Sequence, residues 1–210
     1  MVHADASNFS EGITKEEAYQ QVLDQAEGLF FEQRNWVCNL ANTASLLWHA
    51  YKSLPSPSNK VNWAGFYTHD PLSPPSNPQL ILGPFQGKVA CQTIAFGRGV
   101  CGTAAATQQT QLVADVESFP GHIACDGDSR SEIVVPITVS VGKAGAGADA
   151  GADAGADADG VGEEEEEHKK KKVVVAIIDI DCTEVNGFDE VDRLWLERLA
   201  EMLGRSCDWP

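Results

Sequence analysis

The sequence has no long apolar run and little positive charge, and these two shortages exclude several classes of protein. No stretch approaches the roughly 18 consecutive apolar residues of a transmembrane helix. Lysine and arginine number 15 against 31 acidic residues, which gives a formal net charge of −16. Such an acidic chain repels phosphate backbones and anionic membrane surfaces, so neither nucleic acid nor a membrane is an expected partner.

A secretory leader and a paired-cysteine motif are also missing. Residues 1–10 lack a basic region followed by an apolar stretch, so we expect a cytoplasmic protein. The cysteines include no C-x-x-C pair, which argues against a zinc ribbon and against a thioredoxin-type active site. In a reducing compartment these thiols do not imply structural disulfides. The six cysteines are Cys38, Cys91, Cys101, Cys125, Cys182 and Cys207.

One segment differs in composition from the rest of the chain. Residues 141–172 consist mostly of Gly, Ala and Asp repeats, five glutamates and four lysines in a row, with almost nothing apolar to bury. Ordering such a segment costs conformational entropy without a compensating gain, so we predict a flexible insertion. The repeats lack the ligand spacing of a calcium loop, which leaves a solvated spacer as the better interpretation. Residues 1–210 are therefore predicted to form a single domain that carries this insertion.

Outside the insertion, the chain predicts an α+β fold. Thr14 and Glu17 fit a capping box before an amphipathic helix that ends near Gly28, and a second helix is expected over residues 35–52. Strands are expected over residues 61–67, 79–85, 91–96, 111–116, 131–139 and 173–182, and further helices over residues 100–107 and 188–207. The predicted architecture is a mostly antiparallel six-stranded sheet packed by helices. The buried stripe of the last helix is expected to be Val191, Leu194, Trp195, Leu199, Met202 and Leu203.

Two aspartates occupy the end of the last predicted strand. Asp179 and Asp181 should be neighbours on one face, because side chains alternate along a strand. Two acids beside an apolar Val/Ile run are costly unless water, a cation or a hydrogen-bond donor lies near them. The pair therefore favours a ligand site over a solvated strand end.

Three cysteines lie where a thiol is able to react. Cys125 follows a proline turn in a loop rich in Gly, Asp and Ser, and Cys91 begins the third predicted strand. Cys101 begins the Ala-rich helix, whose dipole is expected to lower the pKa of the thiol. Taken singly, each cysteine is more often a small buried hydrophobe. A zinc site built from these three residues and His122 has no familiar ligand spacing, so no metal is expected.

Four stretches of the chain closely resemble the free methionine-(R)-sulfoxide reductases, small enzymes built on a GAF domain. They are NWAGFY (62–67), VACQTIAFGRGVCGTAAA (89–106), HIACDGDSRSEIVVPI (122–137) and DIDC with FDEVD (within 179–192). The resemblance spans roughly residues 19–203, apart from the insertion and a proline-rich loop. It implies a GAF fold and reduction of free methionine-(R)-sulfoxide without a metal or bound cofactor, with thioredoxin as the reductant.

The resemblance also implies roles for individual residues. The redox residues are the nucleophile Cys125, the usual resolving partner Cys91 and a second redox cysteine, Cys101. The substrate-binding residues are Trp63, Glu132, Asp179 and Asp181. Which of Cys91 and Cys101 resolves the intermediate stays open. Cys182 stands where the family usually has serine, and it is a candidate for a competing thiol.

The chemistry suits this set of residues. A thiolate attacks the sulfoxide sulfur, and a carboxylic acid with a raised pKa protonates the departing oxygen. The sulfenic acid that forms condenses with a second thiol to a disulfide, which a dithiol then reduces. Two alternatives are a non-catalytic GAF module that binds a small molecule and a partner protein that docks through the insertion. Because GAF domains often pair through their helices, a homodimer is also considered.

Overall fold

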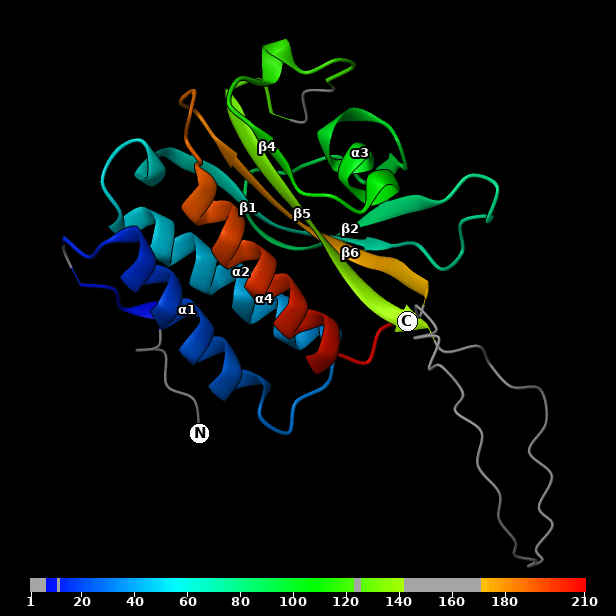
Figure 1. Ribbon diagram of the computed structural model, residues 1–210, viewed down its shortest axis with the longest axis horizontal. Helices are drawn as coiled ribbons and strands as arrows, with labels where there is room; N and C mark the ends of the chain where they lie inside the picture. The colour runs from blue at the N-terminus through cyan, green and yellow to red at the C-terminus, as the bar shows by residue number, and fades with distance from the viewer. Residues whose placement is uncertain (1–6, 11, 123–125, 142–170) are drawn as a thin grey trace, which may run out of the picture.

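Six antiparallel strands form one sheet in the order β3-β2-β1-β6-β5-β4 (Figure 1). The computed structural model describes residues 7–10, 12–122, 126–141 and 171–210. The strands are β1 (Val61–His69), β2 (Gln79–Gly87), β3 (Thr93–Ala95), β4 (Gln111–Val113), β5 (Ser131–Val141) and β6 (Lys171–Cys182). The predicted α+β architecture is confirmed, and the sheet is antiparallel throughout its described strands.

Four α-helices accompany the sheet within the described residues. They are α1 (Lys15–Phe30), α2 (Trp36–Ser53), α3 (Gly99–Thr107) and α4 (Glu190–Ser206), with short 3-10 turns η2 (Ser58–Lys60) and η3 (Val116–Ser118). The capping box predicted at Thr14 and Glu17 is present at the start of α1. A second capping box, formed by Asp189 and Asp192, starts α4. In the described part of the chain, no helix combines the length and the apolar character needed to cross a membrane.

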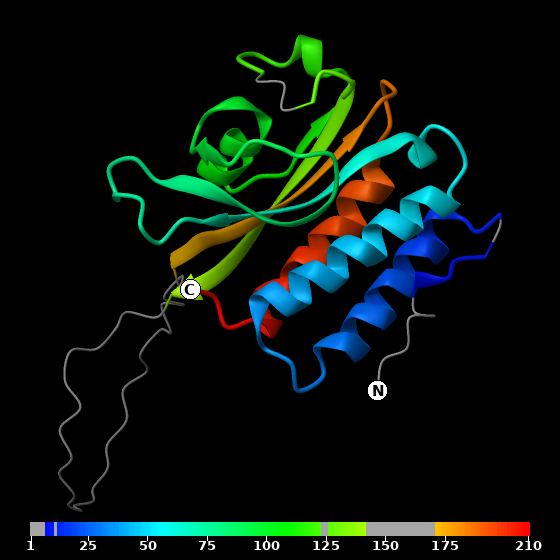
Figure 2. The same cartoon turned by 180° about the vertical axis from the view of Figure 1, so that it is seen from behind.

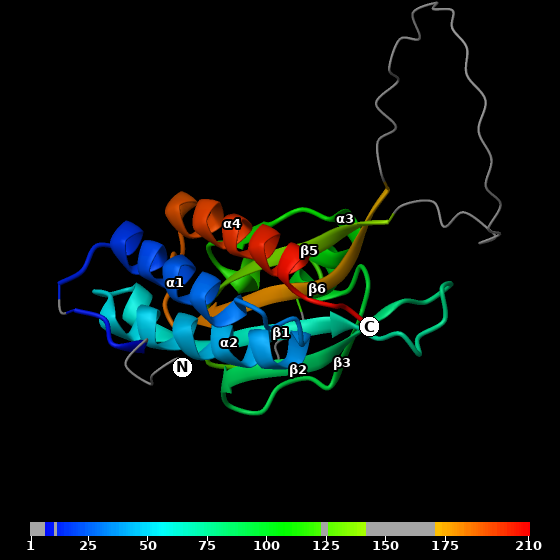
Figure 3. The ribbon, with the colours of Figure 1, turned by 90° about the horizontal axis from the view of Figure 1, so that it is seen from below.

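The two faces of the sheet are covered differently. Helices α1, α2 and α4 lie on one face, and α3 with its adjoining loops lies on the other (Figures 2 and 3). The alternation of β6 explains this arrangement, because Ile178 and Ile180 pack in the core under the three helices, while Ile177 packs in a second core beneath α3. The strand is therefore apolar on both faces until Asp179.

A buried polar network joins the three helices of the first layer. Asp192 of α4 is fully buried, and its Oδ1 accepts hydrogen bonds from the hydroxyls of Tyr19 in α1 (2.8 Å) and Tyr51 in α2 (3.1 Å). The Nζ of Lys15 lies 2.7 Å from the Oδ2 of the same carboxylate. Burial raises the pKa of Asp192, and the ammonium of Lys15 opposes that rise. One carboxylate thus ties α1, α2 and α4 together beneath the sheet.

Three details of the predicted elements are wrong. The strand expected over residues 111–116 ends at Val113, and Val116 begins the 3-10 turn η3. Strand β3 begins at Thr93, so Cys91 lies in the loop before the strand rather than at its start. Leu194 was expected in the buried stripe of the last helix but is 49% exposed, whereas Leu196 is fully buried beside Leu199. The helix is rotated so that Leu196, Leu199 and Leu203 face the sheet, and Leu194 lies outside that stripe.

The predicted insertion begins later and ends earlier than its composition suggests. Val141 pairs with Lys171, and Ser140 pairs with Lys172, in the antiparallel β5–β6 ladder. These ends of the predicted insertion are therefore strand residues, because backbone pairing does not require apolar side chains. The rest of the predicted insertion, residues 142–170, lies outside the described residues.

Candidate active site

One row of residues across the sheet brings the predicted substrate-binding residues together. Glu132 of β5 is paired with Asp181 of β6, and Asp181 is paired with Trp63 of β1. Directly opposed residues of antiparallel strands point to the same face, and here that face is the one beneath α3. Asp179 precedes Asp181 by two residues and shares its face, as the strand period predicts.

The acids border a cavity of about 250 Å³ between the sheet and the start of α3. A volume of this size suits a ligand smaller than the drug-sized molecules that occupy about 300–1,000 Å³. The charged, polar and thiol side chains that line it are Cys91, Thr93, Arg98, Cys101, His122, Asp126, Ser129, Glu132, Asp179 and Asp181. The cavity therefore gathers five of the seven predicted site residues. Cys125, the predicted nucleophile, lies outside the described residues.

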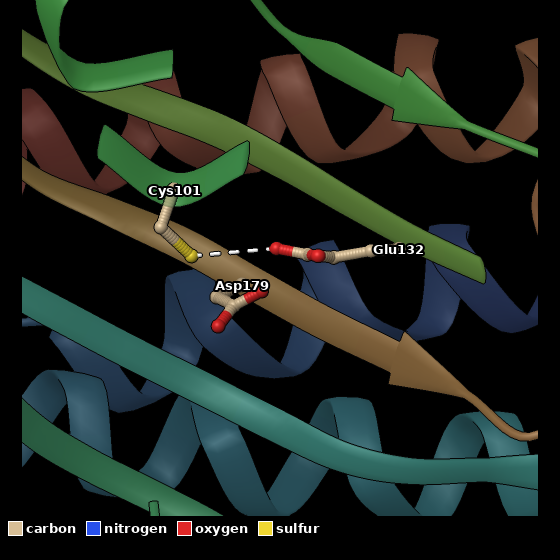
Figure 4. Close-up of side chains that lie close together, drawn as sticks. All are labelled: Cys101, Glu132 and Asp179. Atoms are coloured by element: carbon tan, nitrogen blue, oxygen red, sulfur yellow. Dashed lines mark hydrogen bonds between the residues drawn. The ribbon is translucent and has the colours of Figure 1, made fainter. Parts of the chain in front are cut away.

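The innermost part of the site joins three elements (Figure 4). The Sγ of Cys101, in the first turn of α3, lies 3.4 Å from the Oε1 of Glu132 on β5. One ligand atom each of Cys101, Glu132 and Asp179 lies within 4.8 Å of the others. This spacing would also suit a metal ion. Two carboxyls and a thiol equally suit another cationic group that is desolvated when it enters the cavity.

Burial changes the protonation of every group in this cluster. It raises the pKa of Asp179 to about 6. Burial and then the charge of Asp179 raise the pKa values of Glu132 and Asp181 well above their usual range. Among the described residues, the Oδ1 of Asp179 has no hydrogen-bond partner although the side chain is only 6% exposed. The floor of the cavity thus holds carboxyls that bind protons more tightly than exposed ones do, and one buried oxygen without a donor.

The expected effect of the helix dipole on Cys101 is wrong. The residue does lie in the first turn of α3, but burial, followed by the charge of Asp179, raises the pKa of its thiol. Two nearby carboxyls in a buried site outweigh the partial charge of a helix terminus. Cys101 is therefore a neutral thiol beside Glu132.

The turn before α3 explains how this helix reaches the cavity. Gly97 and Gly99 both have positive φ values, +79° and +61°, which only glycine adopts without strain. A Cβ at Gly102 would lie 2.3 Å from the carbonyl oxygen of Ala95, so glycine also lets α3 pack against β3. Arg98 is the N-cap residue and makes no side-chain cap, and it lines the cavity. The sequence analysis did not identify Arg98, although its place between two glycines was the available signal.

Trp63 lies on the face of the acids but beside the cavity rather than among the described residues that line it. Its ring stacks on Phe85 at 5.2 Å and on Tyr67 at 5.8 Å between centroids, and its Nε1 donates to the carbonyl of Lys88 at 3.1 Å. A Cβ at Gly65 would lie 2.8 Å from this ring. The direct contact with substrate that the resemblance implies for Trp63 stays a prediction.

The loop that carries Cys91 is tied to its surroundings at several points. Cys91 is disulfide-bonded, and its carbonyl accepts a hydrogen bond from the hydroxyl of Tyr67 at 3.1 Å. The Nζ of Lys88 lies 2.7 Å from the Oδ2 of Asp128 and 3.6 Å from that of Asp126. These ion pairs join the Cys91 loop to the segment that follows Cys125 in the sequence.

Cys182 does not approach the cavity. It follows Asp181 on β6, so its side chain lies on the opposite face, in the core under α1, α2 and α4. The residue is fully buried, and its Sγ lies 3.5 Å from the carbonyl oxygen of Pro57. The competing role considered for this thiol is therefore wrong, because the sheet separates it from the acids.

Comparison with known proteins identifies the family of the chain. No family model matches the chain. A solved structure described as a GAF domain superposes with a TM-score of 0.79 and 46% identity, covering 100% of this chain and 98% of that one. The free methionine-R-sulfoxide reductase from Neisseria meningitidis, solved in complex with its substrate, gives a TM-score of 0.69 and 35% identity over 95% of this chain and 93% of that one.

These structural matches define the class of protein, which is a GAF domain. In sequence, the free methionine-R-sulfoxide reductase of Saccharomyces cerevisiae is 48% identical over 205 residues, which are 98% of this chain and 94% of the yeast protein. The chain belongs to the family of free methionine-R-sulfoxide reductases. The resemblance inferred from its four sequence stretches is thereby confirmed.

Proposed function

We propose that this chain reduces free methionine-(R)-sulfoxide to methionine in the cavity beneath α3, with the thiol of Cys125 as nucleophile. The observation that carries the proposal is the cluster of the buried Glu132 and Asp179 with the half-buried Asp181, in one cavity with Cys91 and Cys101. Family membership supports the substrate, because relatives of this chain are named for it. A carboxyl group with a raised pKa is able to protonate a departing oxide.

The first step transfers the sulfoxide oxygen to the enzyme. The sulfur of Cys125 attacks the sulfoxide sulfur, and the oxygen gains a proton from a neutral carboxyl. Glu132 is the proposed donor, since burial and the charge of Asp179 raise its pKa well above the usual range. As the thiol and the sulfoxide react, methionine leaves and Cys125 becomes a sulfenic acid. Asp179 and Asp181 hold the ammonium of the substrate, which gives the unpaired Oδ1 of Asp179 a donor.

The second step forms a disulfide and water. A second thiol attacks the sulfenic sulfur, its proton joins the leaving hydroxide, and the two cysteines become linked. Cys91 is the proposed resolving residue, because its loop is joined by the Lys88 ion pairs to the segment after Cys125. Cys101, which is free beside Glu132, is the proposed second redox thiol.

Restoring the enzyme requires an external dithiol, and we propose thioredoxin for this step. Its two thiols become a disulfide while the enzyme regains two thiols, so electrons and protons balance. A cytoplasmic location is part of the proposal, because an enzyme recycled by a dithiol reductant works in a reducing compartment. The exposed apolar side chains of Phe31 (76% exposed), which follows α1, and Val37 (46% exposed), in the first turn of α2, support a homodimer through the helical layer.

The proposal is tested by replacing Cys125 with serine and measuring turnover of free methionine-(R)-sulfoxide with thioredoxin, thioredoxin reductase and NADPH. We expect loss of turnover, because a serine hydroxyl is a poor nucleophile at neutral pH. Cys38→Ser is the matched control, since Cys38 lies in the first turn of α2 on the other side of the sheet and should leave turnover unchanged. Unchanged turnover in C125S would refute the assignment. Tight ligand binding by a wild-type chain without turnover would identify a binding module instead.

A further inference from the structure

A second hollow lies on the surface, outside the cavity beneath α3. It is open, measures about 680 Å³, and is formed by α2, η2, the start of β1 and the end of β2. Among the described residues, its lining includes three lysines, Lys52, Lys60 and Lys88, and no carboxylate. The whole chain has 15 basic residues against 31 acidic ones. The hollow is therefore a positive patch on an otherwise acidic protein.

Two of these lysines keep their charge without an acidic partner. Within the described part of the chain, no carboxylate forms an ion pair with Lys52 or Lys60. The Nζ of Lys52 lies 4.5 Å from the centre of the Trp48 ring, and Trp48 is a half-buried residue of the same hollow. Tryptophan is enriched at protein interfaces, and cations around it attract an acidic partner surface. The hollow thus has the chemistry of an interface for an acidic protein.

Short contacts join the hollow to the segments that carry the redox cysteines. Lys88 shortly precedes Cys91, which is disulfide-bonded, and its Nζ lies 3.6 Å from the Oδ2 of Asp126. Asp126 directly follows Cys125 in the sequence. The Nδ2 of Asn62, from the β1 side of the hollow, donates to the same Oδ2 at 3.2 Å. A protein seated in the hollow therefore contacts residues that neighbour both cysteines.

We propose that this hollow, together with Val89, is the docking surface for the dithiol protein that reduces the disulfide of Cys91, and that this partner is acidic beside its reactive thiol. The inference rests on the proposed function, which requires such a reductant. Val89 lies between Lys88 and Cys91 and is 89% exposed, so an apolar contact there holds the partner next to the disulfide. The net charge of −16 repels an acidic partner elsewhere, while the lysines attract it here.

Docking places the partner for an ordinary thiol–disulfide exchange. One thiolate of the partner attacks a sulfur of the Cys91 disulfide, and the other cysteine of that disulfide leaves as a thiolate. The second thiol of the partner then attacks the mixed disulfide, which closes the partner's own disulfide and releases the chain with two thiols. A small dithiol such as dithiothreitol performs the same exchange without a protein surface. The docking surface is therefore needed for the protein reductant alone.

The test follows reduction of the disulfide itself in the full chain. The chain is oxidised with a stoichiometric amount of hydrogen peroxide, and the release of thiols is followed after mixing with reduced thioredoxin or with dithiothreitol. The variants are Lys60→Glu and Val89→Asp, whose side chains are both exposed, so the fold should be retained. We expect the second-order rate constant with thioredoxin to fall about 3- to 30-fold in each variant. The rate with dithiothreitol should equal that of wild type.

Arg205→Glu is the matched control, because it reverses an exposed charge at the end of α4 and changes the net charge as K60E does. It should leave both rates unchanged, and added salt should slow thioredoxin more with wild type than with K60E. Wild-type rate constants in K60E and V89D, equal losses with both reductants, or no reduction of wild type by thioredoxin would overturn the docking surface. Normal reduction of the disulfide without turnover of free methionine-(R)-sulfoxide would instead refute the proposed function, so the two failures are distinguishable.

Discussion

Replacing Asp179 with asparagine should stabilise the protein at neutral pH while weakening the binding of the substrate. Burial raises the pKa of Asp179 from 3.8 to about 6, so the folded protein binds this proton more tightly than the unfolded chain does. The stability that the bound proton provides is fully present below the unfolded pKa and is lost as the pH rises through the folded pKa. The difference of about 2.2 in pKa corresponds to about 3 kcal/mol.

Asparagine cannot ionise, so its free energy of unfolding should not show this loss. Relative to wild type, D179N should therefore gain about 3 kcal/mol between about pH 4 and pH 7. The assay is urea denaturation of both proteins at several pH values, with all cysteines kept reduced. The Oδ1 of Asp179 has no partner among the described residues, and an amide there brings a constant offset of about 1–3 kcal/mol, which does not vary with pH.

A matched control uses the exposed carboxyl of Glu27 on α1. E27Q removes one negative charge far from the cluster and should leave the pH dependence of wild type unchanged. The same D179N protein should have a strongly raised KM for free methionine-(R)-sulfoxide, because the ammonium loses a charged partner. A stability difference between D179N and wild type that is flat with pH would refute the assignment of a raised pKa to Asp179.

Three further outcomes are expected. Glu132→Gln should lower kcat by about 100- to 10,000-fold if this carboxyl is the proton donor, measured as a pH–rate profile; an unchanged profile would assign the acid to an aspartate. Asp192→Ala should lower the free energy of unfolding by about 3–5 kcal/mol, measured by urea denaturation, because Lys15 and two tyrosines lose their buried acceptor; a loss under about 1 kcal/mol would show that the network is dispensable. Replacing residues 142–170 by Asn-Gly should keep kcat/KM within about 2-fold of wild type, since Val141 and Lys171 are directly paired and suit a two-residue turn; a large loss would give this segment a role in catalysis.

The fold was predictable because the elements have strong local signals. The capping box at Thr14 and the continuous apolar run of β6 are local patterns, and each appears where the sequence indicates. The residues at which helices and strands begin and end were less predictable. Strand β3 is short because only residues 93–95 find a partner on β2, which is a property of the neighbouring strand rather than of the local sequence.

The candidate site was predictable in its composition but not in its electrostatics. Because side chains alternate along a strand, the sequence placed Asp179 and Asp181 on one face. The structure adds Glu132 directly opposite Asp181. The thiol of Cys101 was expected to have a lowered pKa, because helix position is readable from sequence and burial is not. Arg98 went unnoticed for a similar reason, since an exposed arginine in a glycine turn gains meaning only when the cavity beside it is known.

The two ends of β6 differ in how much change they tolerate. At its start, a segment of any length can join Val141 to Lys171 without moving the paired strands. At its other end, one deleted residue would turn Asp179 and Asp181 into the hydrophobic layer and bring Ile180 into the cavity. Evolution can therefore lengthen this hairpin freely, while a single-codon deletion a few residues further on would abolish folding and chemistry together.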